Sequence, residues 1–149
     1  MRGGVLRLAL MAMLAIVLLS SCGVSESVVA MGDVSLEGWV EPVNITYENS
    51  DTSSLLDMDV TLHVNRRFNA SSIALEITTL TPDSLRYSES VTLPVRVHWA
   101  SNRAKTTDIE IPYRRNVQFT HKGEYYISLS PLQDIAGIEA AGITFQLKR

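Results

Sequence analysis

Cys22 is the residue whose type and surroundings point most clearly to a chemical reaction. It is the only cysteine of the 149-residue chain, so it has no disulfide partner within the chain. Two small residues, Ser20 and Ser21, stand directly before it, and Leu19 precedes them. A thiol at the first position after a cut between small residues can accept diacylglycerol. The local sequence therefore predicts cleavage before Cys22 and lipid attachment to its sulfur.

The residues before Cys22 have the composition of a secretory signal peptide. Arg2 and Arg7 supply positive charge, and residues 8–19 (LALMAMLAIVLL) form an unbroken apolar run. A helix needs about 20 apolar residues to cross a bilayer, so this run is too short for a span and has the size of a signal-peptide core. The alternative is a buried N-terminal helix with an incidental cysteine. We predict a lipoprotein signal peptide over residues 1–21, ending in a lipobox.

Lipid on Cys22 would determine where the protein resides. One acyl chain binds a membrane only marginally, whereas two or more hold it stably. Gly23 stands where an aspartate would resemble the inner-membrane retention signal of enterobacteria, and no acidic cluster follows Cys22 directly. These residues favour a lipid-anchored protein of the outer membrane that faces the periplasm.

The charge of the chain argues against a nucleic-acid partner. The sequence carries 13 Lys and Arg against 16 Asp and Glu, a net charge of −3, and loss of Arg2 and Arg7 with the signal peptide makes it more negative. Recognition of phosphate depends on clustered Lys and Arg. We therefore expect membrane attachment through the lipid on Cys22, other envelope proteins as partners, and no nucleic acid.

The titratable residues do not form a recognisable catalytic or metal site. His63, His98 and His121 lack ligand-pair spacing such as H-x-H, although a joint zinc site is the alternative. Asp57 and Asp59 share one strand face without a loop rich in oxygen ligands, so we expect a solvated face rather than a calcium site. No serine stands in a G-x-S-x-G context. The sequence predicts no enzyme, no cofactor and no metal.

The residues after Cys22 divide into a short tether and one domain. The segment up to residue 37 (GVSESVVAMGDVSLE after the cysteine) is small and polar, which predicts a lipidated, flexible tether over residues 22–37. The alternative is a first strand over residues 28–31, because termini can pair when they are tied into a sheet. The folded domain is then expected over residues 38–149.

This domain alternates at period two, which is typical of half-buried strands. The clearest apolar stripe consists of Leu56, Met58, Val60, Leu62 and Val64. Further stripes run through residues 43–47, 73–77, 91–99, 109–111, 117–119, 125–129 and 143–147. Pro94 lacks an amide donor, so the strand that contains it should lie at a sheet edge or be bulged. About seven to nine short strands of this kind predict an all-β antiparallel β-sandwich or jelly roll.

The last third of the sequence contains several short motifs: Ile111-Pro112-Tyr113-Arg114-Arg115-Asn116-Val117-Gln118-Phe119, Lys122-Gly123-Glu124-Tyr125-Tyr126, Ala136-Gly137-Ile138 and Ala141-Gly142-Ile143. Trp39, Asn65-Arg66-Arg67-Phe68 and Pro82-Asp83-Ser84 precede them. Together these pieces resemble the gliding-motility lipoprotein GldH family of Bacteroidetes. The similarity extends from about Trp39 to Leu147. Residues 97–108 contain no glycine, where the family usually has a glycine-rich stretch, which marks a divergent member.

The resemblance implies a non-enzymatic outer-membrane lipoprotein that binds other envelope proteins and is linked to gliding or to type IX secretion. The alternative is a carbohydrate- or ligand-binding β-sandwich of a surface uptake system. A glycan site would need exposed aromatic side chains, and Tyr87, Trp99, Tyr113 and Tyr126 are the candidates.

Two further candidate sites lie in the regions of resemblance. Tyr113, Arg114, Arg115 and Asn116 are a candidate interaction surface, because arginine and tyrosine are enriched at interface hot spots. The alternative places Tyr113 in the core, in phase with the preceding apolar stripe, with the arginines capping a strand end. Ser84 is a candidate O-glycosylation site, since Asp83-Ser84-Leu85 resembles the short motif of Bacteroidetes envelope proteins and falls on a predicted exposed turn.

Overall fold

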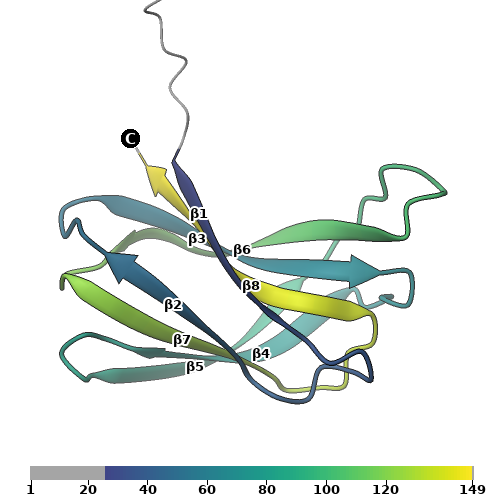
Figure 1. Ribbon diagram of the computed structural model, residues 1–149, viewed down its shortest axis with the longest axis horizontal. Helices are drawn as coiled ribbons and strands as arrows, with labels where there is room; N and C mark the ends of the chain where they lie inside the picture. Colours follow the sequence, from purple (N-terminus) through teal and green to yellow (C-terminus); the bar gives the residue numbers. More distant parts are fainter. Residues whose placement is uncertain (1–25, 149) are drawn as a thin grey trace, which may run out of the picture.

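The computed structural model describes residues 26–148, which form eight strands and contain no helix (Figure 1). The strands are β1 (Ser27–Asp33), β2 (Val43–Asn49), β3 (Leu55–Asn65), β4 (Ser72–Leu80), β5 (Arg86–Pro94), β6 (Thr106–Gln118), β7 (Gly123–Pro131) and β8 (Ile138–Lys148). The predicted signal peptide and the predicted lipidation site Cys22 lie outside the described residues.

The strands form two four-stranded antiparallel sheets packed face to face. Sheet A has the order β1-β8-β3-β6, and sheet B has the order β2-β7-β4-β5. The edge strands β1 and β2 lie near each other on one side of the sandwich, and the edge strands β5 and β6 lie near each other on the opposite side. The predicted antiparallel β-sandwich is therefore confirmed.

The core lies between the sheets and is built from the predicted period-two stripes. Leu62 in β3, Leu75 in β4 and Leu129 in β7 are completely buried. At one end the Tyr47 and Phe145 rings stack with centroids 4.1 Å apart and thereby join the two sheets. Alternation places apolar side chains on one face of each strand, and the two faces then exclude water together.

Strand β1 lies within the segment that was predicted to be a flexible tether. Residues 27–33 pair with β8 along their whole length, from Ser27↔Gln146 to Asp33↔Ala140, so the prediction of a flexible tether through residue 37 is wrong for them. The alternative of a strand near residues 28–31 is the one observed. Gly142 makes this pairing sterically feasible, because a Cβ at that position would lie 2.0 Å from the carbonyl oxygen of Ala30.

Strand β5 also ends before the end of the apolar stripe that the sequence predicts over residues 91–99. The alternation continues to Trp99, but the strand stops at Pro94, and Val95 is buried beyond the strand end. From there the chain crosses from sheet B to sheet A. Trp99 is half-buried, with the Arg66 guanidinium 4.0 Å above the centre of its ring. The edge position that Pro94 predicted is confirmed, since β5 borders sheet B.

Candidate functional site: a groove between edge strands β5 and β6

A groove runs between β5 and β6, where the two sheets end side by side. Three hollows follow each other along it, and we call them together the β5–β6 groove. One of about 330 Å³ lies at the end with the turn between β4 and β5, and one of about 240 Å³ lies beside Ser88. A third, of about 460 Å³, is lined by Pro94, Arg96 and Pro112. Their arrangement suits an extended ligand better than a compact one.

The 330 Å³ hollow has an apolar floor and a polar rim. Met58, Val117 and Phe119 line its floor. Two side chains of its wall are largely open to solvent, Leu85 just before β5 at 50% exposure and Tyr87 in β5 at 59%. Exposed apolar side chains next to a concave apolar surface are characteristic of binding sites rather than of a surface that contacts only solvent.

A cluster of three side chains spans the groove near its middle. Glu89 of β5 accepts hydrogen bonds from the Tyr113 hydroxyl and from Nη2 of Arg114, the second at 2.6 Å. Burial, and next the bond to Glu89, raises the pKa of Tyr113 to about 12. The bond from Arg114, followed by that from Tyr113, lowers the pKa of Glu89. At neutral pH Glu89 is therefore charged and Tyr113 is neutral, so the bridge between the two sheet edges is complete.

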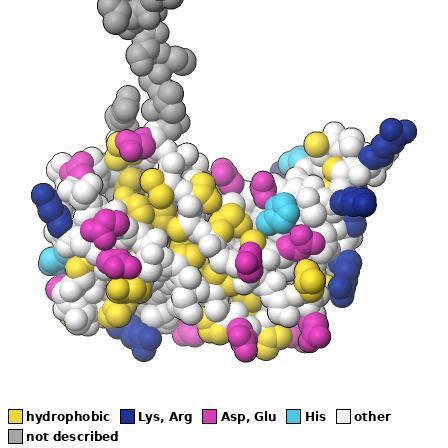
Figure 2. All heavy atoms as spheres, viewed as in Figure 1, with side chains coloured by type: hydrophobic (Ala, Val, Ile, Leu, Met, Phe, Trp, Pro, Cys, Tyr) yellow, Lys and Arg dark blue, Asp and Glu magenta, His cyan; other side chains and the backbone are white. Residues whose placement is uncertain are grey.

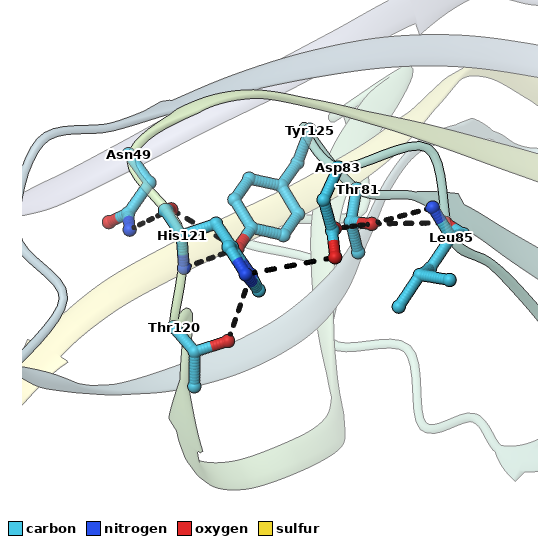
Figure 3. Close-up of polar contacts among 7 residues, drawn as sticks. All are labelled: Asn49, Thr81, Asp83, Leu85, Thr120, His121 and Tyr125. Carbon is cyan, nitrogen blue, oxygen red and sulfur yellow. Dashed lines mark hydrogen bonds and ion pairs between the residues drawn. The ribbon is translucent and has the colours of Figure 1, made fainter.

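The end of the groove is fixed by contacts between two turns (Figure 3). Asp83 precedes β5 and lies 3.7 Å from Nε2 of His121, which precedes β7. A hydrogen bond from the Thr81 hydroxyl is the main cause that lowers the pKa of Asp83. The buried Asn49 donates to the carbonyl oxygens of Phe119 and His121, at 3.1 and 2.8 Å. These contacts hold both turns in place, so this end of the groove is preformed.

Two bulges in β6 determine where its polar residues point. Opposite β3, Leu56 pairs with Val117, Met58 with Arg114 and Asp59 with Pro112, so β6 has more residues than β3 over this stretch. Asn116 has a φ of 56°, and its N–H donates to Oδ1 of Asp57 at 2.9 Å. As a result, Tyr113 and Arg114 both face the groove.

Arg115 instead lies on the face of sheet A that points away from the core. Its Nη2 is 2.6 Å from Oδ1 of Asp59, and its Nη1 donates to the Met58 carbonyl at 3.2 Å. Asp59 Oδ1 has no partner of hydrogen-bond geometry, so its contact with Arg115 is an ionic one. Asp59 is only 6% exposed, which overturns its expected place on a solvated face. Arg115, together with Gln146 bonded to Asp59 Oδ2 at 3.2 Å, covers the carboxylate.

The candidate interaction surface at residues 113–116 is therefore divided rather than continuous. Tyr113 and Arg114 belong to the groove, Arg115 binds Asp59, and Asn116 accepts a hydrogen bond from Nζ of Lys148 at 2.7 Å. The arginines do not cap a strand end, because they lie inside β6. Leu85 and Glu89 were not predicted as binding residues, because no local signal in the sequence marks them.

The other predicted site residues lie in separate places. Of the candidate aromatics, Tyr87 and Tyr113 line the groove, Trp99 lies beneath Arg66, and Tyr126 is exposed beside Leu80 in the β4–β7 register. Ser84 is exposed, with a φ of 67°, in the turn next to the groove. Its glycosylation stays a prediction.

The histidines do not converge. His63 contacts Asp108 at 2.6 Å through Nδ1 and Glu139 at 3.8 Å through Nε2, on opposite sides of its ring. His121 lies beside Asp83, and His98 follows β5. Among residues 26–148, no three His, Cys, Asp or Glu side chains are placed to hold a metal ion. The same residues include no helix of the length and apolarity that a membrane span requires.

No protein-family model and no curated protein sequence matches the chain. The solved structure of a carbohydrate-binding module specific for non-crystalline cellulose, CBM28, is similar with a TM-score of 0.38 and 9% sequence identity. The match covers 79% of this chain and 72% of that one.

Proposed function

We propose that this chain is a non-enzymatic, lipid-anchored component of a bacterial outer membrane that binds another envelope protein in the β5–β6 groove. The observation that carries the proposal is the exposure of Leu85 and Tyr87 beside a preformed apolar hollow. Apolar and aromatic side chains of this kind are the usual anchors of protein interfaces. The resemblance to the GldH family supports a role of this protein in the machinery for gliding or for type IX secretion.

The electrostatics of the groove favour binding over acid–base catalysis. A general acid or base works best with a pKa near the operating pH. Here the pKa values of Asp83 and Glu89 are lowered and that of Tyr113 is raised. Each group is thus held more firmly in the form it already has at neutral pH, which suits a fixed recognition surface.

The lipid anchor would keep the folded domain close to the membrane. Only residues 23–26 separate Cys22 from the start of β1, and this link spans at most about 17 Å when fully extended. We expect Cys22→Ala to leave an uncleaved precursor that takes up no alkyne fatty acid. Ser21→Ala keeps a small residue before the cut and should be labelled like the wild type. Label on the Cys22 variant would contradict the anchor.

Cross-linking in intact cells tests the binding site. Tyr87→Ala should remove the proteins that the wild-type lipoprotein captures, because it deletes the most exposed large apolar side chain of the 330 Å³ hollow. Tyr126→Ala is the matched control, since Tyr126 is a tyrosine of similar exposure, 50%, that does not line this hollow. Capture that survives Tyr87→Ala and fails in Tyr126→Ala would place the binding surface outside the groove.

A glycan is the second candidate ligand, favoured by the presence of both Tyr87 and Tyr113 in one groove with polar residues along its rim. Tyrosine rings offer flat apolar faces, and their hydroxyls offer hydrogen bonds. Affinity electrophoresis of the full-length protein in gels containing soluble polysaccharides separates the two candidates. Retardation that depends on Tyr87 would favour the glycan.

A further inference from the structure

Two main-chain hydrogen bonds, one at each end of β5, show which residues of β5 bond to β4. The Thr81 N–H donates to the Leu85 carbonyl at 2.9 Å, and the Val95 N–H donates to the Ser71 carbonyl at 2.8 Å. Between them the register is unbroken, from Leu80↔Arg86 to Ser72↔Pro94. Hydrogen-bonded pairs alternate along an antiparallel ladder, so the odd-numbered residues of β5 bond to β4.

The even-numbered residues of β5 consequently direct their N–H and C=O groups away from sheet B. These residues are Arg86, Ser88, Ser90, Thr92 and Pro94, the last of which has no N–H, and all five are exposed. Edge strands of soluble proteins are usually blunted by bulges, prolines or charges. Strand β5 has no register shift, its one proline is its last residue, and three of the four outward-bonding residues before Pro94 have small, uncharged side chains. It is a regular edge prepared for another strand.

The β5–β6 groove lies beside this free edge. Ser88 lines the 240 Å³ hollow, which adjoins the 330 Å³ hollow through Tyr87 and Tyr113. A strand added to β5 would lie about 4.8 Å from it and would direct alternate side chains toward the core side of sheet B, where these hollows lie. Strand addition takes affinity from main-chain bonds and specificity from pockets for alternate side chains.

Positive charge lies near both ends of β5 and indicates which residues would suit the ends of an added strand. Arg86 begins β5, Arg96 lies two residues beyond its end, and neither forms a salt bridge within the described residues. Figure 2 shows further Lys and Arg side chains gathered at the end of the molecule that carries the segment between β5 and β6. Acidic residues at the ends of a partner segment would complement this charge.

We propose that the protein partner contributes an extended segment that adds to β5 as a fifth strand of sheet B. Its side chains alternate between apolar residues that enter the groove and polar residues on the outer face, with acidic residues at both ends. This inference rests on the proposed function and specifies how the partner is held.

The probe for a first test is a synthetic peptide with alternating valine and threonine flanked by aspartates, and the protein is the full-length lipoprotein in detergent. The wild type should bind the peptide, and Ser90→Pro should weaken binding at least tenfold. Proline removes the edge N–H at Ser90 without removing a bond to β4. Ser90→Ala is the matched control and should bind like the wild type. Failure of the wild type to bind, or equal binding by Ser90→Pro, overturns strand addition.

A second measurement does not depend on the fold of the proline variant. Hydrogen exchange in the wild type should show rapid exchange of the Ser88 and Ser90 amides without peptide and protection with it, whereas the Tyr87 and Glu89 amides are protected in both states. Peptides N-methylated at successive positions should lose binding with a period of two. A partner, protein or glycan, whose capture needs Tyr87 but tolerates Ser90→Pro would overturn strand addition and leave the groove as the binding site.

Discussion

Strands β5 and β6 both border a sheet on the same side of the molecule, yet they differ in almost every other respect. Strand β6 has two bulges, a proline in its interior at position 112, and an arginine, Arg115, that binds the buried Asp59 of β3. Strand β5 keeps one register throughout and carries mostly serine, threonine and apolar residues. One edge is closed by its own side chains, and the other is left available.

Residue type alone is therefore a poor guide to a binding surface. Arg115 and Asn116 belong to types that are common at interfaces or in tight turns, but contacts within the protein occupy both of them. Ser88 and Ser90 are unremarkable in sequence, but the fold leaves their main-chain groups free. Four predictions test this contrast, from the largest expected effect on stability to the smallest.

Arg115→Ala should lower the free energy of unfolding by about 2 kcal/mol, because it leaves the buried Asp59 carboxylate without its cation. Arg114→Ala removes the neighbouring arginine, whose partner Glu89 is partly exposed, and should cost less than about 1 kcal/mol. Urea unfolding followed by circular dichroism measures both. Equal losses of unfolding free energy would contradict the assignment of Arg115 to a structural contact and of Arg114 to the groove.

Asn116→Val should lower stability by about 1–2 kcal/mol, since a β-branched residue is strained at the φ of 56° that the bulge requires. Ser88→Val places the same side chain on the regular edge β5 and should change stability by no more than about 0.5 kcal/mol. Thermal unfolding compares the two variants. A tolerant Asn116 would indicate that the bulge is not needed to shape β6.

Glu89→Gln should lower stability by about 0.5 kcal/mol at pH 7, a small value because the pair is partly exposed. The folded-state pKa of Glu89 lies below its ordinary value of 4.5, so its contribution is present above pH 4.5 and is lost as the pH falls further. The difference from the wild type should therefore close on acidification. Glu110→Gln on the exposed face of β6 is the control, and a gap that widened at low pH would contradict the bridge.

Tyr87→Ala should change stability least, by about 0.5 kcal/mol or less, because its side chain is 59% exposed. The same variant is expected to abolish capture of the partner. Stability and capture measured on one preparation separate the two effects. A large loss of stability would show that Tyr87 is a packing residue.

The order of apolar and polar residues determined much of the fold. Period-two alternation marks which face of β3, β4 and β7 is buried, since successive side chains of a strand point to opposite faces. Pro94 marks an edge, because it lacks an N–H for a neighbouring strand. These are local properties, and the sequence alone predicted an antiparallel β-sandwich from them. It also predicted cleavage and lipidation at Cys22, a motif read directly from the chain.

Which residues meet depends on contacts between strands that are far apart in the sequence. Strand β1 forms because Gly142, more than a hundred residues away, leaves room for its backbone. Asp59 is buried because Arg115 reaches it across a bulge whose register depends on pairing between β3 and β6. The groove exists because β5 and β6 end different sheets on the same side of the sandwich. Pairing between distant strands, rather than alternation within one, places Tyr87, Glu89 and Tyr113 in one site.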